Sequence, residues 1–152
     1  MAKCKQKHFS AVDTAKVADR LHSAAIHLLR RVRKQDAATG EGPARLSALS
    51  VLVFGGPRTL GDLAAAEKVR PPTMTRIVTG LERGGLARRI TDPKDARRVR
   101  ICATGKGVRL LQLGRERRIE YLARHLAVLV DEELEVLKDA ANILEKLLGQ
   151  WN

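Results

Sequence analysis

The hydrophobic residues near both ends of the chain recur at intervals of three to five positions, which is the spacing of one face of an α-helix. The first such segment runs from about residue 12 to residue 34 and is followed by the glycine-containing stretch 38–43. A second begins at Thr104 and reaches about residue 130, and a third begins at the three acidic residues 131–133. Acidic side chains stabilise the positive end of a helix dipole. The pattern therefore predicts one long helix at the start of the chain and two at its end.

Three shorter helices and a β-hairpin are predicted between these long segments. The helices cover residues 44–54, a short segment that Thr59 caps, and residues 72–83, which the glycine pair 84–85 ends. In the segment 98–103, apolar residues at the odd positions alternate with arginine or cysteine at the even ones. A period of two indicates a strand with one buried face, so Cys102 is expected on the outer face beside two arginines. Pairing with residues 86–91 through the turn 92–95 completes the hairpin.

This order of elements is that of a winged helix-turn-helix. The predicted fold class is mainly α with a small β-hairpin wing, formed by a winged helix-turn-helix and a helical dimerisation region. We expect residues 1–152 to form a single domain. Within it, residues 43–103 are the expected DNA-binding lobe, and residues 10–35 and 104–152 are the expected dimerisation region.

The net charge of the chain indicates what kind of partner it binds. Lys and Arg total 29 against 17 Asp and Glu, and the resulting net charge of +12 indicates a polyanionic partner such as nucleic acid. The surplus lies in residues 1–35, with nine basic and two acidic residues, and in residues 61–103, with ten and five. One Trp, one Tyr and two Phe are too few aromatic residues for binding to single strands by base stacking.

A double-stranded partner fits the predicted helix 72–83. A recognition helix enters the major groove and reads base edges from its N-terminal half. Arg76 can bind guanine through two hydrogen bonds, and the threonines beside it can reach phosphate or the thymine methyl group. Basic residues of the hairpin can reach the backbone or the minor groove, and they position the protein without specifying sequence. The expected DNA-binding residues are Thr73, Thr75, Arg76, Thr79, Arg83, Lys94, Arg97, Arg98 and Arg100.

Three segments resemble the MarR family of transcriptional regulators. Residues 73–89 are similar to the recognition helix and first wing strand of that family, and residues 92–98 (DPKDARR) resemble its wing signature. Residues 103–107 (ATGKG) match the opening of its long helix, with Ala103 in place of the usual leucine. The resemblance assigns Asp92 and Asp95 to bracing the wing.

The resemblance also implies an assembly and its partners. In a homodimer of this type the first, fifth and sixth helices interlock, and two winged lobes contact a pseudo-palindromic DNA duplex. In this family a small anionic or aromatic ligand often binds where the dimer helices meet the lobe and releases the protein from DNA; a constitutive regulator that responds to no ligand is the alternative. The apolar stripes of the terminal helices exceed what the lobe can cover, which independently favours a partner chain. The expected dimerisation residues are Val17, Leu21, Leu126, Leu134, Leu137, Leu144 and Leu148.

Other classes of function find less support in the sequence. We expect no enzyme, cofactor or metal site: His22 and His27 lie five positions apart, whereas ligands on one helical face lie three or four apart. Cys4 and Cys102 are interpreted as incidental thiols, with oxidant sensing as the alternative. No apolar run is long enough to span a bilayer and no signal peptide is seen, so a cytoplasmic location is expected.

The sequence therefore predicts a sequence-specific, double-stranded DNA-binding transcriptional regulator that acts as a repressor. Two alternatives stay open. A structural protein that coats DNA without choosing a sequence would carry the same basic charge. A protein-interaction module would have lost DNA binding, although the threonine and arginine pattern of residues 73–76 argues against this.

Overall fold

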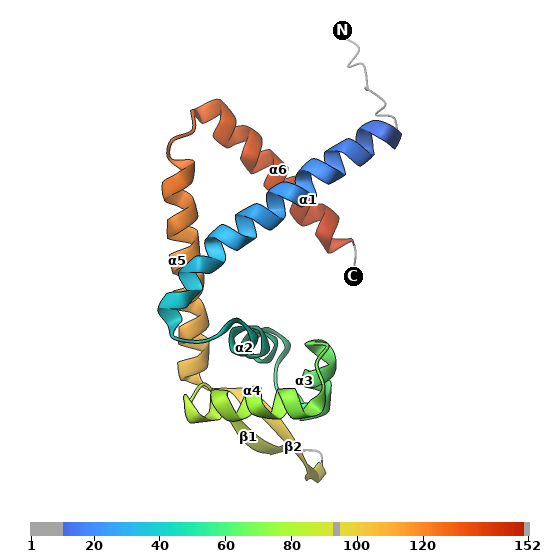
Figure 1. Ribbon diagram of the computed structural model, residues 1–152, viewed down its shortest axis with the longest axis vertical. Coiled ribbons are helices and arrows are strands. Elements are labelled where there is room, and N and C mark those ends of the chain that lie inside the picture. The colour runs from blue at the N-terminus through green and yellow to red at the C-terminus, as the bar shows by residue number, and fades with distance from the viewer. Residues whose placement is uncertain (1–10, 93–94, 151–152) are drawn as a thin grey trace.

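A computed structural model describes residues 11–92 and 95–150, except for the side chains of residues 11, 92, 96 and 97. The elements in chain order are α1 (Ala11–Arg33), the 3₁₀ helix η1 (Lys34–Thr39), α2 (Pro43–Gly55), α3 (Leu60–Ala66), α4 (Pro71–Arg83), β1 (Ala87–Asp92), β2 (Asp95–Ala103), α5 (Gly105–Leu126) and α6 (Asp131–Gly149). In Figure 1, α2, α3, α4 and the hairpin form a lobe at one end, from which α5 leads towards α1 and α6 at the other. The predicted fold class is confirmed, because the described chain is mainly helical with one antiparallel hairpin.

Two element boundaries differ from the sequence prediction. The stretch between the first helix and residue 43 contains η1, which ends at Gly40 with a left-handed φ of 74°. The long helix predicted to reach residue 130 ends at Leu126 instead. Val130 is extended, and its N–H donates to Oε2 of Glu133 at 3.3 Å. Because this bond caps α6, Val130 belongs to the start of the last helix and not to the end of α5.

The hydrophobic core lies inside the lobe. Its largest fully buried side chains come from all three lobe helices and from the hairpin: Leu49, Leu63, Met74, Val78, Leu81, Leu86 and Ile101. Burying an aliphatic side chain of this size contributes roughly 1.5–3 kcal/mol. Since three of these side chains belong to α4, one side of that helix is fixed against α2 and α3 and the other side faces outward.

The turn between α3 and α4 is a Schellman motif with a lysine in the left-handed position. The N–H of Val69 donates to the carbonyl of Ala64 at 3.0 Å, and the N–H of Lys68 donates to the carbonyl of Ala65 at 3.1 Å. Lys68 has a φ of 53°, a region that glycine adopts more readily than other residues. Val69 packs against the core, so the turn fixes the direction in which α4 leaves α3.

The hairpin is attached to the lobe by an isolated β-bridge between Arg58 and Ile101. Arg58, which precedes α3, donates its N–H to the carbonyl of Ile101 at 3.0 Å and accepts a bond from the N–H of Ile101 at 2.7 Å. Strands β1 and β2 pair in antiparallel register, with an irregularity next to the tip. The base of the wing is therefore held by three segments: β1, β2 and the residue Arg58.

The expected exposure of Cys102 is wrong. Cys102 is only 9% exposed, and its Sγ lies 3.6 Å from the carbonyl oxygen of Arg88. Helices α2, α3 and α5 all contact β2, so the neighbouring residues Ile101 and Cys102 are both buried although successive strand residues point to opposite faces. Val99, expected on the buried face, is 52% exposed because it lies farther along the wing. Alternation along β2 thus identified the strand correctly but not how much of it the helices cover.

Helices α1 and α6 lie outside this core. Neither helix contains a buried side chain among the residues described. Helix α5 connects them to the lobe: the N–H of Gly107 donates to the side chain of Thr104 at 3.2 Å, which confirms the predicted helix cap. No helix in the described ranges has the length and apolar character needed to cross a membrane.

Candidate nucleic-acid interface and pocket

Helix α4 separates its side chains into a buried side and a polar side. Met74, Val78 and Leu81 face the core, and Ile77 is partly buried against it. The polar side is exposed at Thr73, Thr75, Arg76 and Arg83 and half-buried at Thr79. Figure 1 shows this helix along the outer edge of the lobe, next to the hairpin. All five predicted contact residues of the helix thus belong to the side that the core leaves open.

The polar side chains of α4 differ in whether they already form a hydrogen bond or an ion pair. The Thr75 hydroxyl donates to the carbonyl of Pro71 at 3.0 Å, so its proton is already used and its oxygen can still accept a bond. In the described ranges, Arg76 and Arg83 form no ion pair, and their guanidinium groups stay available. The arginines therefore offer donors to a DNA edge or phosphate without first breaking an internal contact.

The wing contributes fewer described side chains. Arg98 is exposed, with its Nε 3.4 Å from Oδ2 of Asp95, whereas Arg100 is half-buried. The predicted contact residue Lys94 lies outside the described residues, as do the side chains of Asp92 and Arg97.

The structure also brings forward basic residues that were not among the predicted contacts. Arg70 immediately precedes α4, and Lys68 lies in the turn before it; both are exposed. Arg88 is exposed on β1, and Arg89 pairs with Glu82 of α4 at 3.4 Å. The charges on either side of the proline pair 71–72 were visible in the sequence, but their closeness to the recognition helix depends on the turn.

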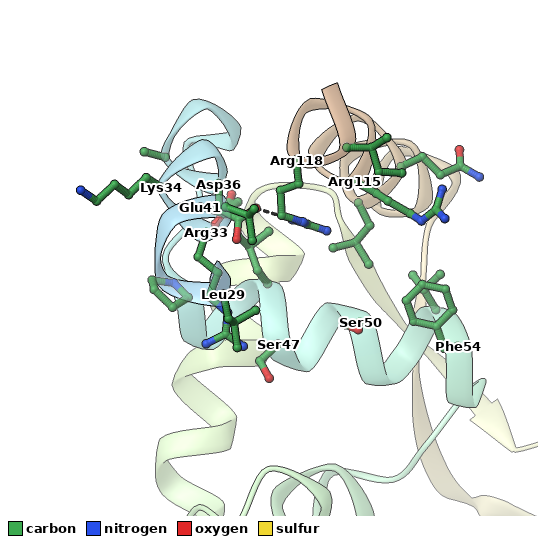
Figure 2. Close-up of a pocket in the computed structure, with 18 of the residues that line it drawn as sticks. Leu29, Arg33, Lys34, Asp36, Glu41, Ser47, Ser50, Phe54, Arg115 and Arg118 are labelled. Carbon is green, nitrogen blue, oxygen red and sulfur yellow. Dashed lines mark hydrogen bonds and ion pairs between the residues drawn. The ribbon is translucent and has the colours of Figure 1, made fainter. Parts of the chain in front are cut away.

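A pocket of about 1170 Å³ lies between the lobe and the long helices. Helix α1, η1, α2 and α5 form its walls, with apolar lining from Leu29, Val53, Phe54, Ile119 and Leu122. Figure 2 shows Arg118 reaching from α5 towards Asp36, while Arg115 and Phe54 lie at the other end of the pocket. Arg33, Lys34 and Arg115 also line the pocket, and none of them forms an ion pair within the described ranges. The pocket thus combines an apolar wall with unpaired positive charge.

The acidic groups of this pocket are held by arginines. Asp36 pairs with Arg118, and Glu41 pairs with Arg45 at 3.0 Å. In the described part of the chain, no group of three His, Cys, Asp or Glu side chains is placed to hold a metal ion. The local chemistry therefore favours an organic anion over a cation as a ligand of this pocket.

The predicted dimerisation residues lie on helices that present apolar side chains to solvent. Val17, Leu21, Leu137 and Leu148 are 42–56% exposed. Leu126, Leu134 and Leu144 are partly buried. Further exposed apolar side chains on the same helices are Val12, Ile26, Leu28, Val136 and Ile143. Exposed apolar side chains grouped in this way are typical of an interaction surface.

Comparisons of the sequence with a family model and with known proteins agree on one family. The family model described as "MarR family" matches residues 43–99, which span α2 to the outer part of β2. An HTH-type transcriptional regulator of Mycobacterium tuberculosis is 35% identical over 136 residues, which cover 90% of this chain and 95% of that protein.

Two solved structures extend the likeness to the whole fold. A transcriptional regulator of Thermotoga maritima has a TM-score of 0.80 at 25% identity and covers 90% of this chain and 96% of its own. The protein NadR, solved in complex with 4-hydroxyphenylacetate, has a TM-score of 0.57 at 26% identity and covers 94% and 97%.

Proposed function

The chain belongs to the MarR family of HTH-type transcriptional regulators, and we propose that it binds a specific double-stranded DNA sequence and represses transcription there. The observation that carries this proposal is the polar side of α4. Arg76 and Arg83 lie there opposite the buried core, without an ion pair to any described residue, and with three threonines on the same side. A helix of this kind can enter the major groove and read base edges.

Specificity is assigned to Arg76 and general affinity to the wing. We expect Arg76→Ala to reduce the preference for the selected duplex by about 5- to 150-fold, from the roughly 1–3 kcal/mol of one bidentate guanine contact. The measurement is fluorescence anisotropy with a duplex enriched from a random pool by the wild-type protein, against a scrambled duplex. Arg124→Ala, on α5 outside the lobe, removes the same charge and serves as the control. An unchanged preference in Arg76→Ala would contradict the assignment.

The wing is expected to act through phosphates. Replacing Lys94 or Arg97 by Ala should weaken binding to both duplexes alike and lower the salt slope by about one for each lost phosphate contact. A loss confined to the selected duplex would show that the wing reads bases instead. Equal, steeply salt-dependent binding of both duplexes by the wild-type protein would favour the DNA-coating alternative.

A homodimer is part of the same proposal. The apolar side chains of α1 and α6 leave a large surface that a second copy can cover, and two lobes would engage the two halves of a pseudo-palindromic site. The half-sites must then lie about 34 Å apart, one turn of DNA.

The effector of the proposed repressor is a small anion with an apolar or aromatic body. The pocket offers the unpaired Arg115 beside Phe54, and the structurally similar NadR is solved with 4-hydroxyphenylacetate. We expect salicylate or 4-hydroxyphenylacetate to weaken binding to the selected duplex, and the neutral benzyl alcohol to have less effect. Arg115→Met should reduce the response to the anions while DNA binding without them is kept. No response to either anion would contradict this effector class.

A further inference from the structure

An ion pair at the start of α2 lies directly against the recognition helix. Nη1 of Arg45 is 3.0 Å from Oε2 of Glu41, and the two side chains are 39% and 14% exposed. Glu41 lies just before Gly42, the N-cap of α2, and Arg45 lies in the first turn of that helix. The carboxylate of Glu41 is thus largely removed from solvent. Leaving this buried charge without its arginine partner would destabilise the protein.

The pair packs against two glycines: Gly80 inside α4 and Gly84, the C-cap of that helix. A Cβ atom added at Gly80 would lie 3.0 Å from Cδ of Arg45, and one added at Gly84 would lie 3.5 Å from Oε1 of Glu41. Glycines four positions apart share one side of a helix. Glycine disfavours a helix interior, so Gly80 is best explained by the room it leaves for Arg45. Gly80 also follows Arg76 by four positions, which makes it the neighbour of the proposed base-reading residue.

The acidic member of this pair, Glu41, belongs to the wall of the pocket. Its N–H donates to Oγ1 of Thr39 at 3.2 Å. Oγ1 of Thr39 donates to the carbonyl of Asp36 at 2.6 Å, and Asp36 pairs with Arg118 of α5. Successive contacts therefore run from α5, through residues 36–45, to the backbone of α4.

We propose that Glu41 and Arg45 are positioning residues that hold α4 in its DNA-reading orientation and connect it to the pocket wall. The inference rests on the proposed DNA-binding function. Arg45 acts through Gly80 and the helix that carries Arg76, and it does not itself read bases. Arg45 packs over Gly80, and a larger side chain at position 80 would push against the arginine. The position of α4 therefore depends on this contact.

The first test compares two losses of one positive charge. Arg45→Met keeps an unbranched apolar side chain but removes the ion pair, and Lys138→Met removes a cation from an exposed pair on α6, far from the lobe. Binding is measured by anisotropy with the selected and scrambled duplexes. We expect Arg45→Met to lower the preference for the selected duplex about tenfold, with binding to the scrambled duplex changed less than twofold. Lys138→Met and wild type should behave alike.

The second test uses the glycine. Gly80→Ala should lower the preference in the wild-type background, because the new methyl group would lie 3.0 Å from Cδ of Arg45 and the arginine must shift. It should have little further effect when combined with Arg45→Met. Glu41→Gln, which removes the charge and keeps the shape, should resemble Arg45→Met. Hydrogen–deuterium exchange without DNA should be faster at the α4 amides in Arg45→Met and unchanged in Lys138→Met.

The outcomes separate the inference from the proposed function. If the wild-type protein selects no duplex, the proposed function fails and the inference with it. If wild type selects a duplex that Arg45→Met and Glu41→Gln bind with the same preference, the inference alone fails. Equal weakening on both duplexes, with a salt slope lower by about one, would mean that Arg45 contacts phosphate directly and would overturn its positioning role.

Discussion

At the scale of single residues, Gly107 decides how α5 docks on the lobe. A Cβ atom added there would lie 2.2 Å from the carbonyl oxygen of Leu86 and 3.0 Å from Cδ1 of Leu49. The same carbonyl accepts the N–H of Thr104 at 2.9 Å. Thr104 and Gly107 therefore contribute to the same contact between α5 and the lobe. Thr104 caps α5 and binds the base of the hairpin, and Gly107 allows the helix to approach that base closely.

We expect Gly107→Ala to lower the free energy of unfolding by about 3 kcal/mol, because the methyl group must push apart backbone and core. Urea unfolding followed by circular dichroism measures this change. Gly105→Ala is the matched control, since its methyl group would meet only Nη1 of Arg109 at 3.5 Å, an ordinary contact. Equal stability of the two variants would show that α5 can shift on the lobe without cost.

At the scale of elements, the turn between α3 and α4 carries local strain. A left-handed conformation costs a residue other than glycine roughly 1–2 kcal/mol, and Lys68 adopts it with a φ of 53°. Glycine loses about 0.5–1 kcal/mol more conformational freedom on folding, which offsets part of this cost. Lys68→Gly should therefore stabilise the protein by about 0.5–1 kcal/mol in thermal or urea unfolding. A less stable variant would show that the lysine side chain has a compensating contact.

At the scale of the whole molecule, the exposed apolar side chains of α1 and α6 determine the assembly we propose. A charge on this surface should oppose a dimer, because it would be buried without a partner. Leu137→Glu is expected to shift the mass in sedimentation equilibrium from twice the 16.7 kDa of one chain towards that of one chain.

Asn142→Glu adds the same charge to α6 at an exposed polar position and should leave the mass unchanged. The wild-type melting temperature should also rise with protein concentration, as for any dimer that is more stable than its subunits. A wild-type mass of one chain at micromolar concentration would contradict the proposed assembly.

Much of the fold was readable from the sequence, because the signals involved are local. The period of the apolar residues identified the helices, alternation along residues 98–103 identified a strand, and Thr59 and Thr104 marked helix starts that the structure confirms. The predicted residues of α4 also face outward, since they lie a quarter to a half turn around the helix from Met74 and Leu81. Such features depend on neighbours a few positions away, and the sequence contains those neighbours directly.

The tertiary structure alone decided the features that join distant segments. Cys102 is covered by helices that follow and precede it, although its strand pattern predicted exposure. The contact between Arg45 and Gly80 spans 35 positions, and the ion pair of Asp36 with Arg118 spans 82. In the sequence, Gly80 is a glycine inside the predicted helix 72–83, and Glu41 lies in the glycine-containing stretch 38–43. The role of each residue depends on which surfaces meet in the folded chain. Hydrophobic burial across the whole lobe determines that arrangement, whereas the local preference of a single segment does not.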